Sequence, residues 1–233
     1  MMIRSLCITI LLLGSCLGAT AAPAEDGLAE ARPGERLYAY DEHTPGQRFM
    51  ILAQRAYKAG MHEGALAHYK AAARWADKFA QYNVGIMHLR GEGTDYDPLR
   101  GWAWLEVSAE RGYPQFEDAA DSLWALFNES ERNRARAILE QEVLPHFSDD
   151  QTLERTAREM RFRLRDATGT RTGSRAFMGM LTIIDRTGFP RDADEFYDPD
   201  KWNFNTIVDY ETRLMRAAPE GEVKVRELEL DDA

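Results

Sequence analysis

The hydrophobic positions between residues 79 and 89 recur at the spacing of an amphipathic helix. Glycines follow at once, and glycine is favoured where a helix ends because it adopts positive φ at no steric cost. We therefore predict a helix that ends at Gly91, with Gly93 in the loop after it. The apolar stripe of this helix has a spacing of three and four residues and consists of Phe79, Tyr82, Ile86 and Leu89. Val84 and Met87 widen the stripe.

A second predicted helix begins near Pro98 and is apolar over more of its surface, so we expect neighbours on more than one side. The first helix carries Gly85 at its centre, which costs about 1 kcal/mol relative to alanine. Close contact with a neighbouring helix would offset that loss. We therefore predict a helical hairpin that crosses closely at Gly85.

Small residues recur at a fixed interval around this hairpin. When residues 65–81 are laid on residues 101–117, Ala73 falls on Ala109 and Ala76 on Gly112, each at an offset of 36. Short helical hairpins cannot bury their apolar faces alone, so neighbouring hairpins stack. The pattern predicts a mainly α protein that begins with a short α/α solenoid of about three hairpins.

Residues 65–116 resemble the Sel-one-like repeat, a relative of the tetratricopeptide repeat. The matching positions are Ala80, Gln81, Val84, Gly85, Gly91, Gly93, Ala109 and Gly112. The sequence departs from the pattern at His88, where the repeat usually has tyrosine and where we expect a packing role, and at Gly101 and Ser108. Upstream, residues 52–73 resemble a tetratricopeptide-type hairpin. Downstream, residues 114–145 look like a closing repeat, with Asn128 and Glu131 able to form a capping box.

The resemblance covers about residues 47–145 and implies an adaptor or scaffold rather than an enzyme. We assign repeat packing to a set of small residues and candidate partner contacts to three aromatic residues, although most aromatic residues of the repeat should be core. The packing set is Ala80, Gly85, Gly91, Gly93, Ala109 and Gly112. The candidate contacts to a protein or peptide are Tyr82, Trp102 and Trp104.

The sequence of residues 148–233 predicts a basic helix and a small α+β module. The helix starts at a capping box of Ser148 and Gln151 and ends before Gly169, and seven arginines lie between residues 155 and 175. Arg165, Arg171 and Arg175 are candidate anion-binding residues beside a loop rich in glycine and hydroxyl groups. Alternatively, these arginines pair with the acidic segments 185–200 and 220–232.

The predicted module has two strands and one helix. Residues 176–185 are rich in apolar and β-branched side chains, and residues 222–230 alternate imperfectly in polarity. Both patterns favour strands. Between them, residues 205–218 predict a helix capped by Asn205.

The first residues predict export. Arg4 precedes an apolar run over residues 6–13, which is far shorter than the ~20 residues of a membrane-spanning helix, so we predict no transmembrane span. One reading is a signal peptide of residues 1–21; the other is a lipoprotein signal of residues 1–15, with Cys16 acylated. Residues 22–46 would form a tether, 47–147 the repeats, and the mature chain would be periplasmic.

Composition and motifs exclude several classes of function. The chain has 233 residues and a formal net charge of -10, which argues against nucleic-acid binding. Both cysteines lie in the signal, the five histidines form no metal-ligand spacing, and the acids near residue 198 miss the glycine of a calcium loop. We therefore predict no cofactor and no metal, and expect a non-enzymatic interaction protein of the bacterial cell envelope. The alternative is an envelope protein that binds or hydrolyses an anionic or peptidoglycan-derived molecule through residues 155–175.

Overall fold

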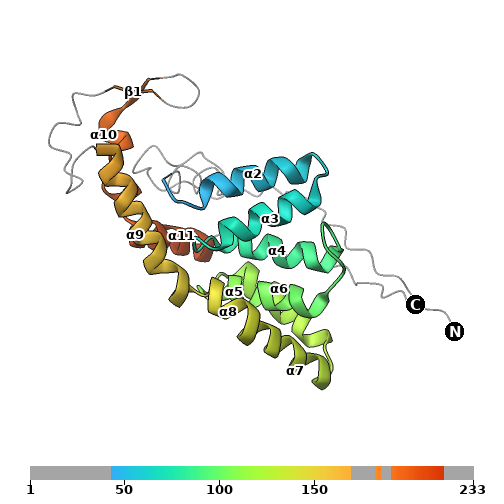
Figure 1. The fold of residues 1–233 in the computed structure, drawn as a ribbon. Helices are drawn as coiled ribbons and strands as arrows, with labels where there is room; N and C mark the ends of the chain where they lie inside the picture. The colour runs from blue at the N-terminus through green and yellow to red at the C-terminus, as the bar shows by residue number, and fades with distance from the viewer. Residues whose placement is uncertain (1–42, 169–181, 185–189, 218–233) are drawn as a thin grey trace, which may run out of the picture.

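A computed structural model of the chain describes residues 43–168, 182–184 and 190–217, and most of these residues are helical (Figure 1). The prediction of a mainly α fold is confirmed. In chain order the elements are α2 (Gln47–Lys58), α3 (His62–Ala73), α4 (Lys78–Arg90), α5 (Pro98–Ala109), α6 (Pro114–Leu126), α7 (Glu129–Ile138), the π-helix η1 (Leu139–Val143), α8 (Leu144–Phe147), α9 (Asp149–Thr168), β1 (Thr182–Ile184), β2 (Pro190–Asp192), α10 (Ala193–Phe196), the 3-10 helix η3 (Asp200–Trp202) and α11 (Phe204–Ala217).

Local side-chain chemistry sets the ends of several helices. Asp77 before α4 and Asp97 before α5 each accept a hydrogen bond from the backbone N–H three residues further on. Asn128 and Glu131 form the predicted capping box at α7, with bonds of 3.0 and 2.8 Å. Helix α4 ends as expected at Gly91, where φ is 64°.

The helices up to α7 stack as hairpins in chain order. Helix α2 packs on α3, α3 on α4, α4 on α5, and both α6 and α7 on α5. The turns inside the hairpins, residues 59–61, 91–97 and 127–128, lie along one edge at the right of Figure 1, which we call the hairpin-turn edge. The connections between hairpins, residues 74–77 and 110–113, lie along the opposite edge beside α9 and α11, which we call the connection edge.

Two glycines bring α4 and α5 into close contact. A Cβ atom added to Gly85 would lie 2.9 Å from Cγ of Leu105 and 3.0 Å from the carbonyl oxygen of Gly101. A Cβ atom added to Gly101 would lie 2.8 Å from Cδ2 of Leu89. Real Cβ contacts are longer, so the backbones approach to a distance that only glycine permits at either position.

The other predicted packing residues have different surroundings. Ala80 is fully buried, whereas Ala109 is half-buried at the end of α5. Gly93 has a φ of 70°, and a Cβ atom there would overlap the carbonyl group of His62 at the start of α3. Gly112 has a φ of 67° and lies in the turn between α5 and α6, so its role is backbone conformation rather than helix packing.

The most buried face of α4 overlaps the predicted apolar stripe only at Val84 and Met87. Phe79, Tyr82, Ile86 and Leu89 are only half-buried. Because α3 and α5 pack on α4 from two sides, the buried face is wide and centres on the close glycine crossing. It contains Lys78, Ala80, Gln81, Val84, Gly85, Met87 and His88.

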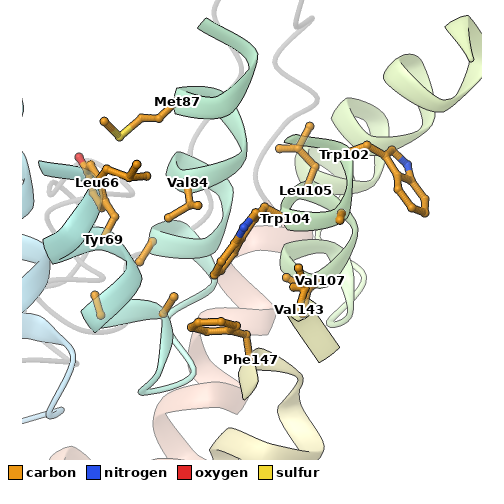
Figure 2. Packing of buried hydrophobic residues seen from close by; sticks show 14 of the residues in the cluster. Leu66, Tyr69, Val84, Met87, Trp102, Trp104, Leu105, Val107, Val143 and Phe147 are labelled. Atoms are coloured by element: carbon orange, nitrogen blue, oxygen red, sulfur yellow. The ribbon is translucent and has the colours of Figure 1, made fainter. Parts of the chain in front are cut away.

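A continuous hydrophobic core runs through the hairpins (Figure 2). Trp104 packs against Phe147 with ring centroids 4.4 Å apart, and Trp102 stacks on Trp124 at the same distance. Both Trp102 and Trp104 are buried, so their prediction as partner contacts is wrong: α5 is covered by α4, α6 and α7. Tyr82 is half-buried and stacks on Phe116, with ring centroids 4.7 Å apart.

The C-terminal helices join the hairpins through a second, smaller core. Met160 of α9 with Phe204 and Ile207 of α11 packs against Ala76 in the connection between α3 and α4. Helix α9 ends at Thr168, close to the predicted end. Helix α11 begins one residue earlier than predicted, and the side chain of Asn203, rather than of Asn205, accepts a backbone hydrogen bond there.

The strands described are short. β1 and β2 pair antiparallel, with Ile183 opposite Arg191. Only residues 182–184 of the first predicted strand are described, and the predicted strand at 222–230 lies outside the described residues, as do the signal, Cys16 and most of the predicted tether. The last tether residues belong to the folded body, because the His43 ring stacks on Trp202 at 4.1 Å.

Candidate functional site

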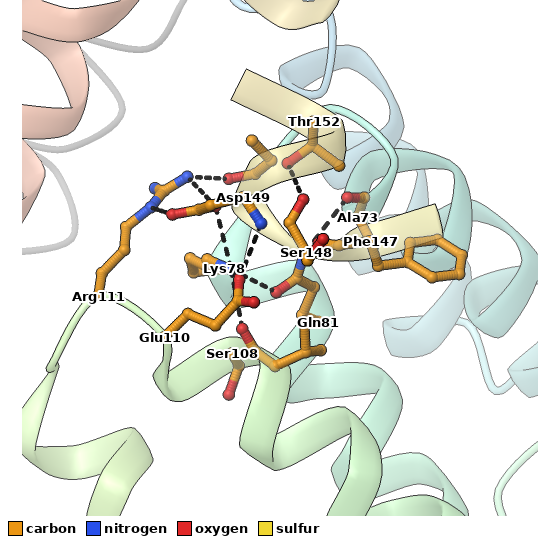
Figure 3. Close-up of polar contacts among 12 residues, drawn as sticks. Ala73, Lys78, Gln81, Ser108, Glu110, Arg111, Phe147, Ser148, Asp149 and Thr152 are labelled. Atoms are coloured by element: carbon orange, nitrogen blue, oxygen red, sulfur yellow. Dashed lines mark hydrogen bonds and ion pairs between the residues drawn. The ribbon is translucent and has the colours of Figure 1, made fainter. Parts of the chain in front are cut away.

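The strongest concentration of buried charge lies at the connection edge, around the first residue of α4 (Figure 3). Lys78 has 0% of its side chain exposed. Its Nζ donates to Glu110 at 2.6 Å, to the carbonyl oxygen of Val107 at 2.8 Å and to Oε1 of Gln81 at 3.1 Å, and it lies 3.1 Å from Asp149. A buried ammonium needs such partners, because an unpaired one would shed its proton or unfold the site.

Arg111 continues the cluster from the turn between α5 and α6. Its guanidinium makes two hydrogen bonds to Asp149, of 2.8 and 3.0 Å, and one of 2.9 Å to the carbonyl oxygen of Ala76. It also lies 3.3 Å from Glu211 on α11, which accepts a 2.7 Å bond from the Tyr113 hydroxyl. We call Lys78, Glu110, Arg111, Asp149 and Glu211 the buried ion network.

The buried ion network fastens four parts of the chain to one another. Lys78 comes from α4, Glu110 and Arg111 from the connection after α5, Asp149 from the start of α9, and Glu211 from α11. Arg216 adds a 3.0 Å bond to the carbonyl oxygen of Arg111. The predicted boundary at residue 148 is therefore crossed by charged contacts as well as by the smaller core.

Burial and mutual attraction shift the protonation equilibria in opposite directions. Burial, reinforced by the charge of Arg111, lowers the pKa of Lys78. Burial alone would raise the pKa of Asp149, but hydrogen bonds and charge from Arg111 and then Lys78 outweigh it, so that pKa is lowered. Loss of hydration raises the pKa of Asp77, beside the network, to about 6.

Burial decides what the network can do chemically. Lys78 and Tyr113 are fully buried, and each carboxylate that meets them accepts hydrogen bonds from the chain itself. The Lys78 ammonium has no exposed surface through which a substrate could reach it in this arrangement. The arrangement is suited to holding the connection edge together, as buried ion pairs with full partners do.

Gln81 extends the polar contacts toward the closing helices. Its Nε2 donates to the carbonyl oxygen of Phe147 at 2.8 Å, while Oε1 accepts from Lys78. Thus a residue that matches the repeat pattern satisfies a backbone group 66 positions away. Such a contact explains why a buried position of α4 carries an amide.

His88 is the second polar side chain on the buried face of α4. It is 3% exposed, and neither ring nitrogen has a hydrogen-bond partner among the described residues. Burial, with the positive charges of Lys70 and Arg100, lowers its pKa from 6.5 to about 4. His88 therefore packs as a neutral ring at neutral pH.

The hairpin-turn edge differs from the connection edge in having exposed apolar side chains. Met61, Tyr96 and Leu126 are 60%, 50% and 65% exposed, and each lies at a different hairpin turn. The loop that carries Tyr96 is held in place, since Gly93 contacts the backbone of His62 and the Tyr57 hydroxyl donates to Glu92 at 2.7 Å.

The candidate anion-binding residues are only partly described. Arg165 is exposed near the end of α9, with its guanidinium 5.8 Å from the ring of Phe162. Arg171 and Arg175 lie outside the described residues, so their convergence with Arg165 stays a prediction. Within α9, Arg163 pairs with Glu159 at 3.0 Å.

Among the described residues, no group of three or more His, Cys, Asp or Glu side chains is placed to hold a metal ion. Among the same residues, no helix combines the length and apolarity needed to span a bilayer. Asp192 and Asp198, two of the acids that suggested a calcium loop, accept backbone hydrogen bonds from residues 194 and 200.

The buried ion network was not foreseen in the sequence, although a signal for it exists. Lys78, Gln81, Gly85 and His88 recur at intervals of three and four residues, which places them on one face of a helix. Because Gly85 marks the close crossing, the polar residues on its face must be buried as well.

No family model, curated protein or solved structure matches this chain.

Proposed function

We propose that this chain is a non-enzymatic scaffold of the bacterial cell envelope, which binds another protein or a peptide along the hairpin-turn edge of its α/α solenoid. The observation that carries the proposal is the placement of Met61, Tyr96 and Leu126. Of the five large apolar side chains that are exposed among the described residues, these three lie at successive hairpin turns.

The two edges of the hairpin stack differ in a way that supports this proposal. At the connection edge, α9 and α11 cover the turns, and the buried charged groups there already have partners within the chain. At the hairpin-turn edge, apolar side chains face solvent, as expected where a partner displaces water.

The hairpin-turn edge is also fixed in shape before any partner binds. Gly93 anchors its loop on α3, and Glu92 holds Tyr57 of α2. A surface that is ordered in advance loses little conformational freedom on binding, which favours affinity. The resemblance to Sel-one-like repeats, which imply adaptors and scaffolds, and the predicted export signal agree with this role.

Site-specific photo-crosslinking in intact cells tests the proposal. A photoreactive residue is placed in turn at Met61, Tyr96 and Leu126, and in control variants at Arg48 and Glu154, which are exposed but lie away from the hairpin-turn edge. We expect one envelope protein to be captured from the three edge positions and not from the controls.

The captured protein is then purified and its affinity measured directly. The triple variant M61S/Y96S/L126S should bind at least tenfold more weakly, because truncating an apolar anchor costs more than about 1 kcal/mol, while its melting temperature stays unchanged. Equal capture from edge and control positions, or turnover of a cell-wall substrate by the purified protein without a partner, would refute the scaffold role.

A further inference from the structure

The solvent face of α9 carries a stripe of arginines around an exposed aromatic ring. With 3.6 residues per turn, Arg158, Arg161, Phe162 and Arg165 lie within an arc of about 100°. All four are exposed, and Phe162 is 57% exposed. The opposite face of α9 is buried through Thr152, Thr156 and Met160, so the helix presents the arginine side to solvent in a fixed orientation.

Positive charge extends from this stripe onto the connection between α3 and α4. Arg155 lies over the Trp75 ring at 5.8 Å and donates to the carbonyl oxygen of Arg74, whose own side chain is exposed. Besides burial, the charges of Arg74 and Arg158 lower the pKa of Arg155, as expected among like charges. We call Arg74, Arg155, Arg158, Arg161, Arg165 and Phe162 the α9 basic face.

The chain does not pair the outer arginines of this face with its described carboxylates. Glu154 lies within the same arc and Asp166 lies beside it, but neither forms an ion pair with a described residue. Glu159 pairs with Arg163, which lies on the same side of α9 as the buried Thr156 and not on the arginine stripe. Within residues 43–168, 182–184 and 190–217, no carboxylate forms an ion pair with Arg158, Arg161 or Arg165. A protein with a net charge of -10 therefore displays a local positive surface. Acids more than about 10 Å away are screened from it at ordinary ionic strength.

The shape and chemistry of the α9 basic face favour one class of partner. Guanidinium groups bind phosphate oxygens through paired hydrogen bonds, and an aromatic ring between them suits the apolar layer just below a phosphate surface. The ring projects from a single convex helix. The deformable surface of a lipid bilayer can accept such a ring, whereas a folded acidic protein would need a pocket of complementary shape.

We propose that the α9 basic face binds the anionic phospholipid surface of a membrane, with Arg158, Arg161 and Arg165 on lipid phosphates and the Phe162 ring inserted beneath them. This binding orients the hairpin stack on the membrane. It needs neither acylation of Cys16 nor the scaffold role, because it rests on the side chains of the α9 basic face.

Vesicle co-sedimentation of the full-length exported protein tests the proposal, in a Cys16→Ala background so that no acyl chain contributes. Vesicles of phosphatidylcholine alone are compared with vesicles that also contain phosphatidylglycerol. We expect the protein to sediment with the anionic vesicles only and to be released as salt rises.

Charge reversal shows whether the α9 basic face carries the binding. The variant R158E/R161E/R165E should lower the partition coefficient at least about 100-fold, since loss of each arginine near an anionic surface costs about fivefold and the three glutamates add repulsion. Phe162→Ser should lower it about tenfold through lost apolar contact. The matched control R48E/R55E/R134E reverses three exposed arginines on α2 and α7 and should lower it far less.

Four results would overturn the proposal. Three of them are equal binding to neutral and anionic vesicles, equal losses in the two triple variants, and full binding after reversal of the α9 arginines. A fourth is saturable capture of an acidic envelope protein by the α9 basic face with no binding to anionic vesicles. All reversed side chains are exposed, and a melting curve for each variant verifies that the fold is kept.

Discussion

Replacement of Arg111 by methionine removes the guanidinium at the centre of the buried ion network and keeps most of the side-chain volume. Asp149 loses two hydrogen bonds of 2.8 and 3.0 Å, and Glu211 loses a positive charge 3.3 Å away. Removal of one partner from a buried ion pair costs about 3–5 kcal/mol, because the remaining charge stays desolvated. We expect Arg111→Met to lower the free energy of unfolding by that amount.

Urea unfolding at neutral pH, followed by circular dichroism, measures the loss. For a chain of this size the loss corresponds to a fall in melting temperature of roughly 10 °C. The control is Arg134→Met, which changes an exposed arginine on α7 and should stay within about 0.5 kcal/mol of the unchanged protein. The double variant R111M/D149N should be less destabilised than the sum of its parts by about 1–3 kcal/mol.

An Arg111→Met variant as stable as Arg134→Met would refute this expectation. So would full additivity in the double variant, since additivity would mean that Arg111 and Asp149 do not stabilise each other. Either outcome would show that the Arg111–Asp149 contact does not help to hold α9 on the hairpins.

Three further predictions concern helix packing and pH. Gly85→Ala should destabilise the protein by about 1–3 kcal/mol through overpacking. Gly64→Ala on α3, where an added Cβ atom meets nothing within 4 Å, should stabilise it by up to about 1 kcal/mol. Chemical unfolding that ranks the two variants the other way would contradict the close crossing at Gly85. Gly93→Ala should cost about 2 kcal/mol or more, since its φ of 70° and its contact with His62 both exclude a side chain; an unchanged melting temperature would count against this. The pKa of His88 is about 4 in the folded protein, below its ordinary 6.5. As pH drops, the unfolded chain therefore takes up a proton first, and stability falls between about pH 6.5 and 4. His88→Gln should remove up to about 3 kcal/mol of that fall; identical pH profiles of stability for the variant and the unchanged protein would refute the buried neutral ring.

Rules that act within a few residues predicted much of the helical framework. The end of α4 at Gly91, the capping box of Asn128 and Glu131, and the end of α9 follow from side-chain and backbone preferences that need no knowledge of the rest of the fold. Gly85 was predictable as well, because a helix-breaking residue inside a regular apolar pattern requires a close neighbour.

The buried side of α4 and the role of the tryptophans depended on contacts across the chain. The apolar periodicity indicated Phe79 and Tyr82, yet the wide interface with both α3 and α5 buried Lys78 and Gln81 instead. Whether Trp104 faced a partner or the core was decided by Phe147, which is 43 positions away. A hydrophobic pattern along one helix shows that a face is buried, but not which neighbour covers it.

The buried ion network shows a second limit of sequence reasoning. Charged residues near helix ends normally read as solvated, and Lys78, Arg111 and Glu211 are each at such a position or on an apparently polar helix. Their pairing joins residues up to 100 positions apart, which no local rule describes. The same holds for the hairpin-turn edge, since only the stacking of hairpins brings Met61, Tyr96 and Leu126 to one side.

We propose above that the hairpin-turn edge is where this protein binds its partner. The most direct measurement is the yield of one cross-linked adduct in living cells from a photoreactive group at position 96, compared with the yield from position 154 on α9. We expect a strong adduct from position 96 that disappears when Met61 and Leu126 are replaced by serine, and no adduct from position 154. A comparable adduct at both positions, or one that survives those replacements, would contradict it.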